Sequence, residues 1–200
     1  MPQDSVVPMG PADGSTSRPM LLVDAGYLLV RLKASSDPFE FAAHWMTDPL
    51  LKIATCTSLV ASRYCETASA LLHDEQKGCF FDIVSAPKGY LSLAIHSLAG
   101  IDAERTDRSL FSAARGEVVF EGFYERQDFF ESWTLQLWSI KVLEADSFGY
   151  IGKLNRSFPQ VEFEILYAAV RREYGLNLPA PQEIRDRGVD PRRQARRSGE

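Results

Sequence analysis

The sequence contains few of the residues that build metal sites or disulfide scaffolds. Its three cysteines, Cys56, Cys65 and Cys79, are an odd and sparse set, which excludes a disulfide framework and favours a reducing, cytoplasmic setting. The three histidines lie far apart, and their spacing from the cysteines matches no zinc motif. We therefore expect no metal and no cofactor.

Long apolar runs and nucleotide-binding loops are missing as well. No stretch of about 18 apolar residues occurs, so the sequence predicts no membrane-spanning helix. The first residues carry no basic cluster followed by an apolar stretch, which argues against a secretory signal. There is no Gly-x-Ser-x-Gly elbow, P-loop or Gly-x-Gly-x-x-Gly motif. The formal net charge of −5 argues against nucleic-acid binding, which depends on Lys and Arg.

Composition and charge divide the chain into three parts. Residues 1–20 hold four prolines and two glycines with a net charge of −1, which predicts a disordered leader. Residues 179–200 hold six arginines and four acids and lack apolar periodicity, which predicts a mobile, Arg-rich tail of charge +2. The segment 21–178 therefore carries −6, and we expect it to form a single globular domain.

Alternating or short apolar runs predict the strands of this domain. They occur at 20–23, 79–84, 91–95 and 117–125, with a turn at 86–89 between the second and third. A helix over 90–98 is the alternative for the third. The segment 134–143 is ambiguous, and we interpret it as a strand that pairs with 117–125.

Helical spacing and capping residues predict the helices. Asp48-Pro49 begins a long helix over 50–72 that closes at Gly78, and a buried helix runs from Pro159 to Gly175. Asp37-Pro38 also has the form of a helix start, and 107–115 fits a short helix. The order of elements predicts an α+β fold, with an antiparallel sheet (meander), a long N-terminal-half helix and a buried C-terminal helix.

The strand 117–125 is the strongest candidate for a binding surface. Alternation places one set of side chains toward the core, namely Val118, Phe120 and Tyr124. It places the other set outward, namely Glu117, Val119, Glu121, Phe123 and Glu125. Apolar side chains within an acidic rim are typical of protein interfaces, although a solvated outer face is the simpler interpretation. The pattern favours a basic protein partner, and an outward Phe123 is also consistent with a homodimer.

We therefore favour a non-enzymatic, intracellular protein-binding domain, such as an adaptor, a chaperone-like protein or a neutralising partner. The first alternative is a metal-dependent phosphodiester hydrolase that holds Mg²⁺ with the strand-end carboxylates Asp24, Glu144 and Asp146. Their simpler roles are that Asp24 caps a turn and that Asp146 begins a helix at 147–156. The second alternative is a small-ligand-binding domain with a pocket among the nine aromatic residues of 120–150.

Overall fold

The computed structural model describes residues 20–24, 27–33, 38–44, 48–73, 78–99, 114–145 and 157–182. Within these ranges the chain forms two antiparallel meanders, a three-stranded sheet and a four-stranded sheet, with three long α-helices and a short 3-10 helix. The α+β class and the antiparallel meander are therefore as predicted, although the strands divide between two sheets. The expected leader (1–20), the expected helices at 107–115 and 147–156, and the tail beyond residue 182 fall almost wholly outside the described ranges.

The three-stranded sheet consists of β1 (Met20–Asp24), β2 (Tyr27–Lys33) and β3 (Pro38–His44). The predicted first strand is confirmed, but the predicted helix start at Asp37-Pro38 is wrong. Pro38 is the first residue of an edge strand, a position where its missing N–H costs no ladder hydrogen bond. Phe39 in the same strand stacks on the ring of Phe120, with 5.2 Å between ring centroids, so packing between the sheets favours the extended chain.

Helix α1 (Pro49–Ala61) begins as predicted and ends earlier than predicted. The Asp48 carboxylate accepts a hydrogen bond from the Leu51 N–H at 3.1 Å, and Pro49 occupies the first turn. The helix stops at Ala61 because Arg63 takes a left-handed conformation, with a φ of 60°. The segment that we had expected to continue this helix is strand β4 (Thr67–His73).

The four-stranded sheet continues with β5 (Gly78–Ala86), β6 (Tyr90–Leu98) and β7 (Arg115–Glu125). The predicted strands are confirmed here, and the helical alternative for 90–98 is wrong. The predicted turn is the short helix η2 (Pro87–Gly89), in which Lys88 and Gly89 both have positive φ. The inner face of the sheet is fully buried at Phe81, Ile83, Leu91, Leu93 and Ile95.

The predicted strand at 134–143 is wrong, because this segment lies within the long helix α2 (Arg126–Ala145). Its buried residues follow helical spacing: Phe129, Phe130, Trp133, Leu137 and Ile140. The predicted C-terminal helix is confirmed as α4 (Gln160–Tyr174), which ends where Gly175 adopts a φ of 75°.

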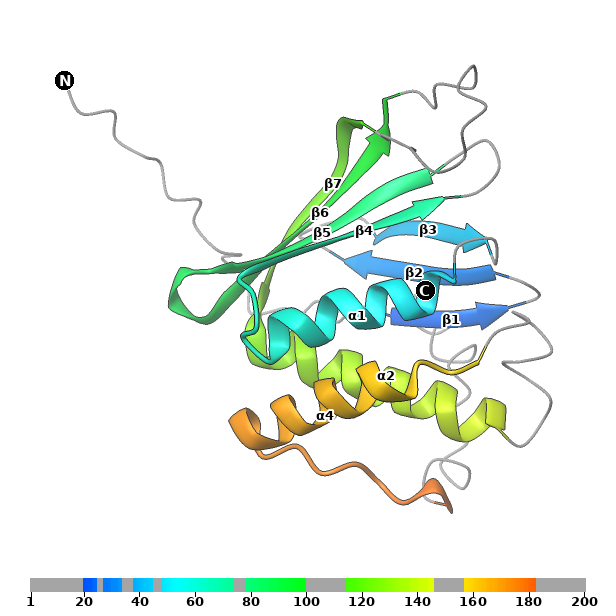
Figure 1. The fold of residues 1–200 in the computed structure, drawn as a ribbon, viewed down its shortest axis with the longest axis vertical. Coiled ribbons are helices and arrows are strands. Elements are labelled where there is room, and N and C mark those ends of the chain that lie inside the picture. Colours follow the sequence, from blue (N-terminus) through cyan, green and yellow to red (C-terminus); the bar gives the residue numbers. More distant parts are fainter. Residues whose placement is uncertain are drawn as a thin grey trace.

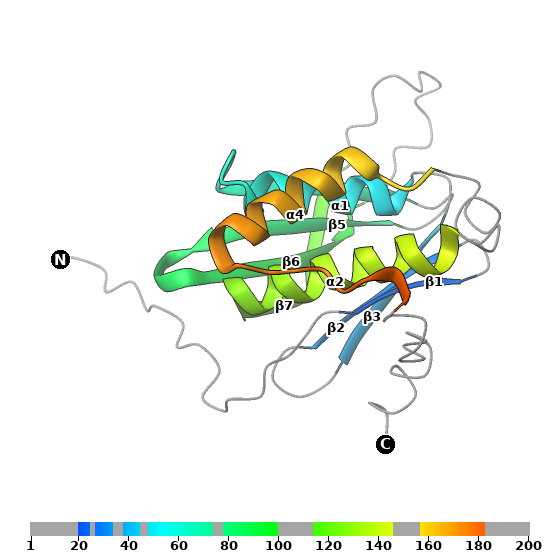
Figure 2. The ribbon, with the colours of Figure 1, turned by 90° about the horizontal axis from the view of Figure 1, so that it is seen from below.

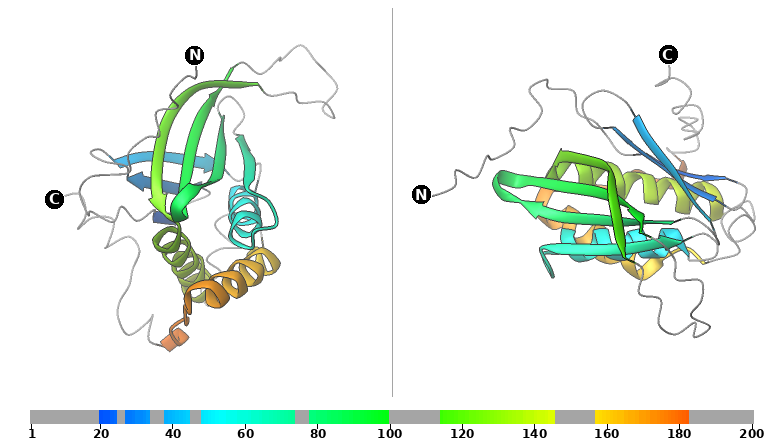
Figure 3. Two further views of the ribbon diagram at one scale, coloured as in Figure 1. Left: turned by 90° about the vertical axis from the view of Figure 1, so that its left-hand side faces the viewer. Right: turned by 90° about the horizontal axis from the view of Figure 1, so that it is seen from above.

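The helices lie on one side of the four-stranded sheet. Figures 1 and 3 show α1, α2 and α4 beneath the sheet, with the three-stranded sheet beside them. Seen from below, α2 and α4 run side by side, and the chain after α4 passes along them (Figure 2). No described helix covers the other side of the four-stranded sheet, which we call the outer face.

Candidate binding surface

Strand β7 places the predicted glutamates in solvent. Glu117, Glu121 and Glu125 are all exposed, whereas Phe120 and Tyr124 are buried against the core. The alternation that predicted this arrangement is regular from Phe120 to Glu125, where β7 pairs residue by residue with β6. The strand register therefore confirms the prediction that Glu121 and Glu125 lie on one face of the sheet.

A register shift changes the other half of the strand. Val118 was expected to face the core, but 54% of it is exposed, and neighbouring Val119 is 46% exposed. The pairing of β6 with β7 shifts between Ile95 and His96 and again before Leu98, which interrupts the alternation. The two valines thus form an exposed apolar pair that strict alternation does not predict.

Further apolar side chains lie on the outer face beside β7. Phe123, predicted to point outward, is half-buried, and its cross-strand neighbour on β6 is Ser92. The same row continues to Val84 on β5, which is exposed, and ends at Thr67 on β4. The outer face therefore combines apolar side chains with the carboxylates of its edge strand β7.

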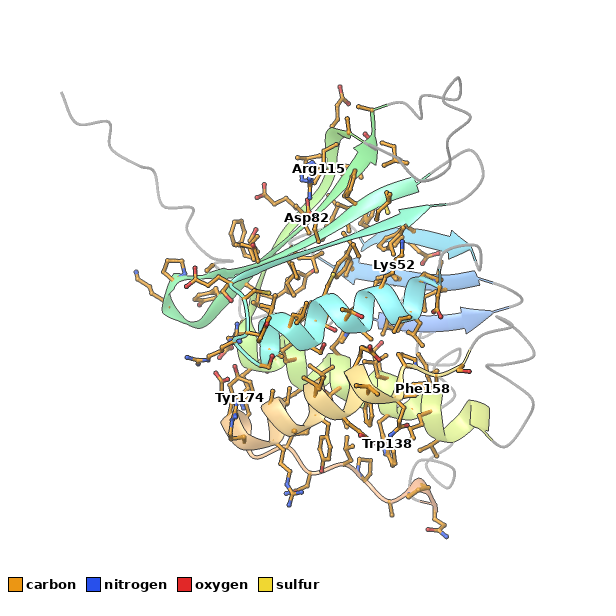
Figure 4. The ribbon with its side chains drawn as sticks, in the orientation of Figure 1. Lys52, Asp82, Arg115, Trp138, Phe158 and Tyr174 are labelled. Atoms are coloured by element: carbon orange, nitrogen blue, oxygen red, sulfur yellow. The ribbon has the colours of Figure 1, made fainter. Side chains whose placement is uncertain are left out.

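One polar residue from each strand of this sheet joins a cluster that the sequence did not reveal. Its members are Ser69, Asp82, His96 and Arg115, and we call it the Asp82 cluster. Arg115 binds the Asp82 carboxylate with both Nε (2.8 Å) and Nη2 (3.0 Å), as Figure 4 shows for the two side chains. The His96 Nε2 atom lies 3.4 Å from Oδ2 of Asp82, and the Ser69 hydroxyl donates to Oδ1.

The geometry of the Asp82 cluster fits a structural role, in which it connects neighbouring strands, better than a catalytic one. Both oxygens of Asp82 already accept hydrogen bonds, and the Ser69 hydroxyl donates to this carboxylate rather than to a histidine. A nucleophilic triad requires the serine to donate to the imidazole. The hydrogen bond to Asp82 raises the pKa of Arg115, whose guanidinium also lies 4.5 Å from the ring centroid of Phe80. The cluster therefore crosslinks the outer face near the two exposed valines.

The carboxylates proposed for a metal site are only partly described. Asp24 ends β1 and Glu144 lies in the last turn of α2, but their side chains and all of Asp146 lie outside the described parts. The expectation that Glu144 follows a strand is wrong, since it belongs to a helix. Among the described residues, no group of three or more His, Cys, Asp or Glu side chains is placed to hold a metal ion.

The three cysteines are free, and two of them are poor nucleophiles. Burial raises the pKa of the Cys79 thiol to about 11. Burial likewise raises the pKa of the Cys56 thiol to about 11, with smaller contributions from the nearby Cys65 and Asp82. A thiol reacts as its thiolate, so neither cysteine is prepared for catalysis near neutral pH.

Comparisons with protein-family models, curated proteins and solved structures found no match for this chain. Within the described residues, no helix is long and apolar enough to cross a membrane. What the chain binds must therefore be inferred from its own side chains.

The aromatic residues of 120–150 are mostly core side chains. Phe129 contacts the rings of Tyr124 and Trp133, each at a centroid distance of 5.3 Å, beneath the inner face of the sheet. Trp138, which Figure 4 labels, stacks on Phe163 of α4 at a centroid distance of 6.0 Å and donates from Nε1 to the Pro179 carbonyl at 3.0 Å. Phe148 and Tyr150 lie outside the described residues. These contacts account for the aromatic concentration as packing between sheet and helices.

Proposed function

We propose that this chain is a non-enzymatic domain that binds another protein through the outer face along β7. The observation that carries the proposal is the exposed pair Val118 and Val119, which lies beside exposed Glu121 on a sheet face without a described helix. Apolar side chains surrounded by charged ones are the usual anatomy of a protein interface. The cytoplasm is the proposed setting, supported by the three free cysteines.

The charge of the strand favours a basic partner. Within the described ranges, Glu117, Glu121 and Glu125 form no ion pair, and Arg115 of the same strand is bound to Asp82. Three exposed carboxylates along one strand attract Lys and Arg side chains and repel acidic surfaces. The proposed partner is therefore a protein segment in which basic residues accompany apolar ones, the apolar ones contacting Val119 and Phe123.

A displayed library of random peptides tests this proposal without knowledge of the natural partner. Peptides are selected on the full-length protein, and their affinities are then measured for the Glu121→Lys/Phe123→Ala variant. We expect enriched peptides to contain Lys or Arg with apolar residues, to bind more weakly at high salt and to lose at least about tenfold in affinity for this variant.

The matched control is the Tyr64→Ala/Glu66→Lys variant, which makes the same kinds of change at exposed residues between α1 and β4. It should retain the affinity of the parent protein. The proposal is overturned if the selected peptides lack basic residues, or if they bind the parent and the Glu121→Lys/Phe123→Ala variant equally well while both remain folded.

A further inference from the structure

Helix α4 carries an exposed stripe that no described part of the fold covers. The stripe consists of Val161, Glu164, Ile165, Ala168, Arg171 and Arg172, all exposed. Their spacing of three and four residues places them on one side of the helix. The opposite side, which includes Phe163 and Leu166, is buried against the other helices. Val161 is 63% exposed and Ile165 is 45% exposed, so two β-branched apolar side chains one turn apart face solvent.

The charges of this stripe are ordered along the helix. Glu164 lies in its first half, whereas Arg171 and Arg172 lie in its last turn. In the described parts of the chain none of the three forms an ion pair, and the Glu164 carboxylate accepts a hydrogen bond from Gln160 of its own helix. The helix dipole favours this order of charges, but it gives no reason for the exposed valine before Glu164 or the exposed isoleucine after it.

We infer that this stripe binds the same stripe of a second copy of the chain, with the two helices antiparallel. A two-fold axis between Ile165 and Ala168 places each isoleucine against the partner's Ala168. The same axis brings Glu164 toward the partner's Arg171 and Arg172, and it covers Val161 with the stem of an arginine. A parallel arrangement would instead oppose like charges, so charge selects the antiparallel dimer.

The dimer is expected to be weak. One face of a 15-residue helix buries much less than the roughly 800 Å² per partner of a standard interface. Dimerisation should therefore depend on protein concentration and weaken with salt, because the ion pairs lie at the surface.

Complementary charge reversal tests the antiparallel geometry in the full-length chain. The variant Glu164→Arg and the variant Arg171→Glu/Arg172→Glu are each measured by sedimentation over a range of concentrations. In a homodimer of either variant, like charges face each other at both symmetry-related contacts. Each variant measured alone should therefore have a dimer dissociation constant at least about tenfold higher than that of the parent protein. An equimolar mixture pairs every reversed charge with its complement and should restore association to the parent level.

The variant Ile165→Asp should abolish association, and Ile165→Leu should preserve it. Circular dichroism checks that each variant is folded. A parent protein that stays monomeric at all concentrations overturns the inference, whatever else contacts the stripe. Two further results overturn it: a dimer that survives Ile165→Asp, and a mixture that associates no better than its separate components. None of these residues lies on the outer face, so the outcome is independent of the peptide experiment.

Discussion

The hydroxyl of Tyr124 shows how a single buried polar atom can lower stability. Tyr124 is 4% exposed, and its oxygen has no hydrogen-bond partner among the described residues. An unpaired buried hydroxyl costs about 1–3 kcal/mol. We expect Tyr124→Phe to raise the free energy of unfolding by about 1 kcal/mol in urea denaturation, since the ring and its contact with Phe129 remain. Tyr90→Phe, at an exposed tyrosine, should leave it unchanged. A destabilised Tyr124→Phe protein would mean that the hydroxyl is paired.

At the scale of elements, Arg126 joins three of them. It is the first residue of α2, directly after β7, and only 7% of it is exposed. Its guanidinium donates to the carbonyls of Val60 (2.7 Å) and Ala61 (3.3 Å), at the end of α1, and to the Ser85 hydroxyl on β5 (3.0 Å). The last carbonyls of a helix have no partner within the helix and carry its negative dipole end, so a buried cation stabilises them.

We expect Arg126→Met to lower the free energy of unfolding by roughly 1–3 kcal/mol, because the substitution removes three hydrogen bonds and leaves the Ala61 carbonyl unpaired, whereas the Val60 carbonyl keeps its bond from the Arg63 N–H. Arg126→Lys should lose less, since one ammonium can still reach a carbonyl. Urea denaturation gives both values, with Gln127→Met as the control at the exposed next residue of the same helix. A loss no larger for Arg126→Met than for this control would show that the three elements hold together without it.

The elements that the sequence predicted correctly have one clear period. Strand β7 alternates from Phe120 to Glu125, and α4 has helical spacing between a proline and a glycine, so local residues are enough to predict both. The segment 67–73 fits either period, and only its pairing with β5 makes it a strand. In α2, the alternation of Ser139-Ile140-Lys141-Val142 indicated a strand, while the buried contacts of Trp133 and Leu137 require a helix. Tertiary packing determines whether such segments form a strand or a helix.

The same distinction applies to the candidate surface. The positions of Glu121 and Glu125 follow from alternation, but the exposure of Val118 results from a register shift that depends on β6. The Asp82 cluster could not be predicted, because Ser69 and Arg115 are 46 residues apart in sequence and meet only through the order of the four strands.

At the scale of the whole molecule, Glu173 connects the end of α4 to the end of α1. Its carboxylate accepts hydrogen bonds from Arg63 Nη2 at 2.5 Å and from the Tyr174 hydroxyl at 3.0 Å. Burial by itself raises the pKa of Glu173, but these hydrogen bonds and the charges of Arg63 and Arg126 outweigh it and hold the pKa below its ordinary value near 4.5. Burial, followed by the hydrogen bond to Glu173, raises the pKa of Tyr174 to about 12.

These two shifts predict opposite limits of stability. A carboxyl whose pKa is lower in the folded protein stabilises the fold above its unfolded pKa, and this contribution disappears as pH falls through the folded value. A tyrosine whose pKa is raised stabilises the fold below its ordinary value near 10, and the contribution is lost as pH rises toward 12.

Urea denaturation at stepwise pH should therefore show Glu173→Gln less stable than the parent protein near neutral pH, with the difference shrinking below about pH 4.5. Tyr174→Phe should flatten the alkaline limb, and it should also make the acid limb shallower, because it removes one of the hydrogen bonds that lower the pKa of Glu173. If the free energies of unfolding of Glu173→Gln and the parent protein change with pH in parallel across the acid range, the Glu173 carboxyl has the same pKa in the folded and the unfolded chain. The contact between α1 and α4 would then not depend on the charge of Glu173.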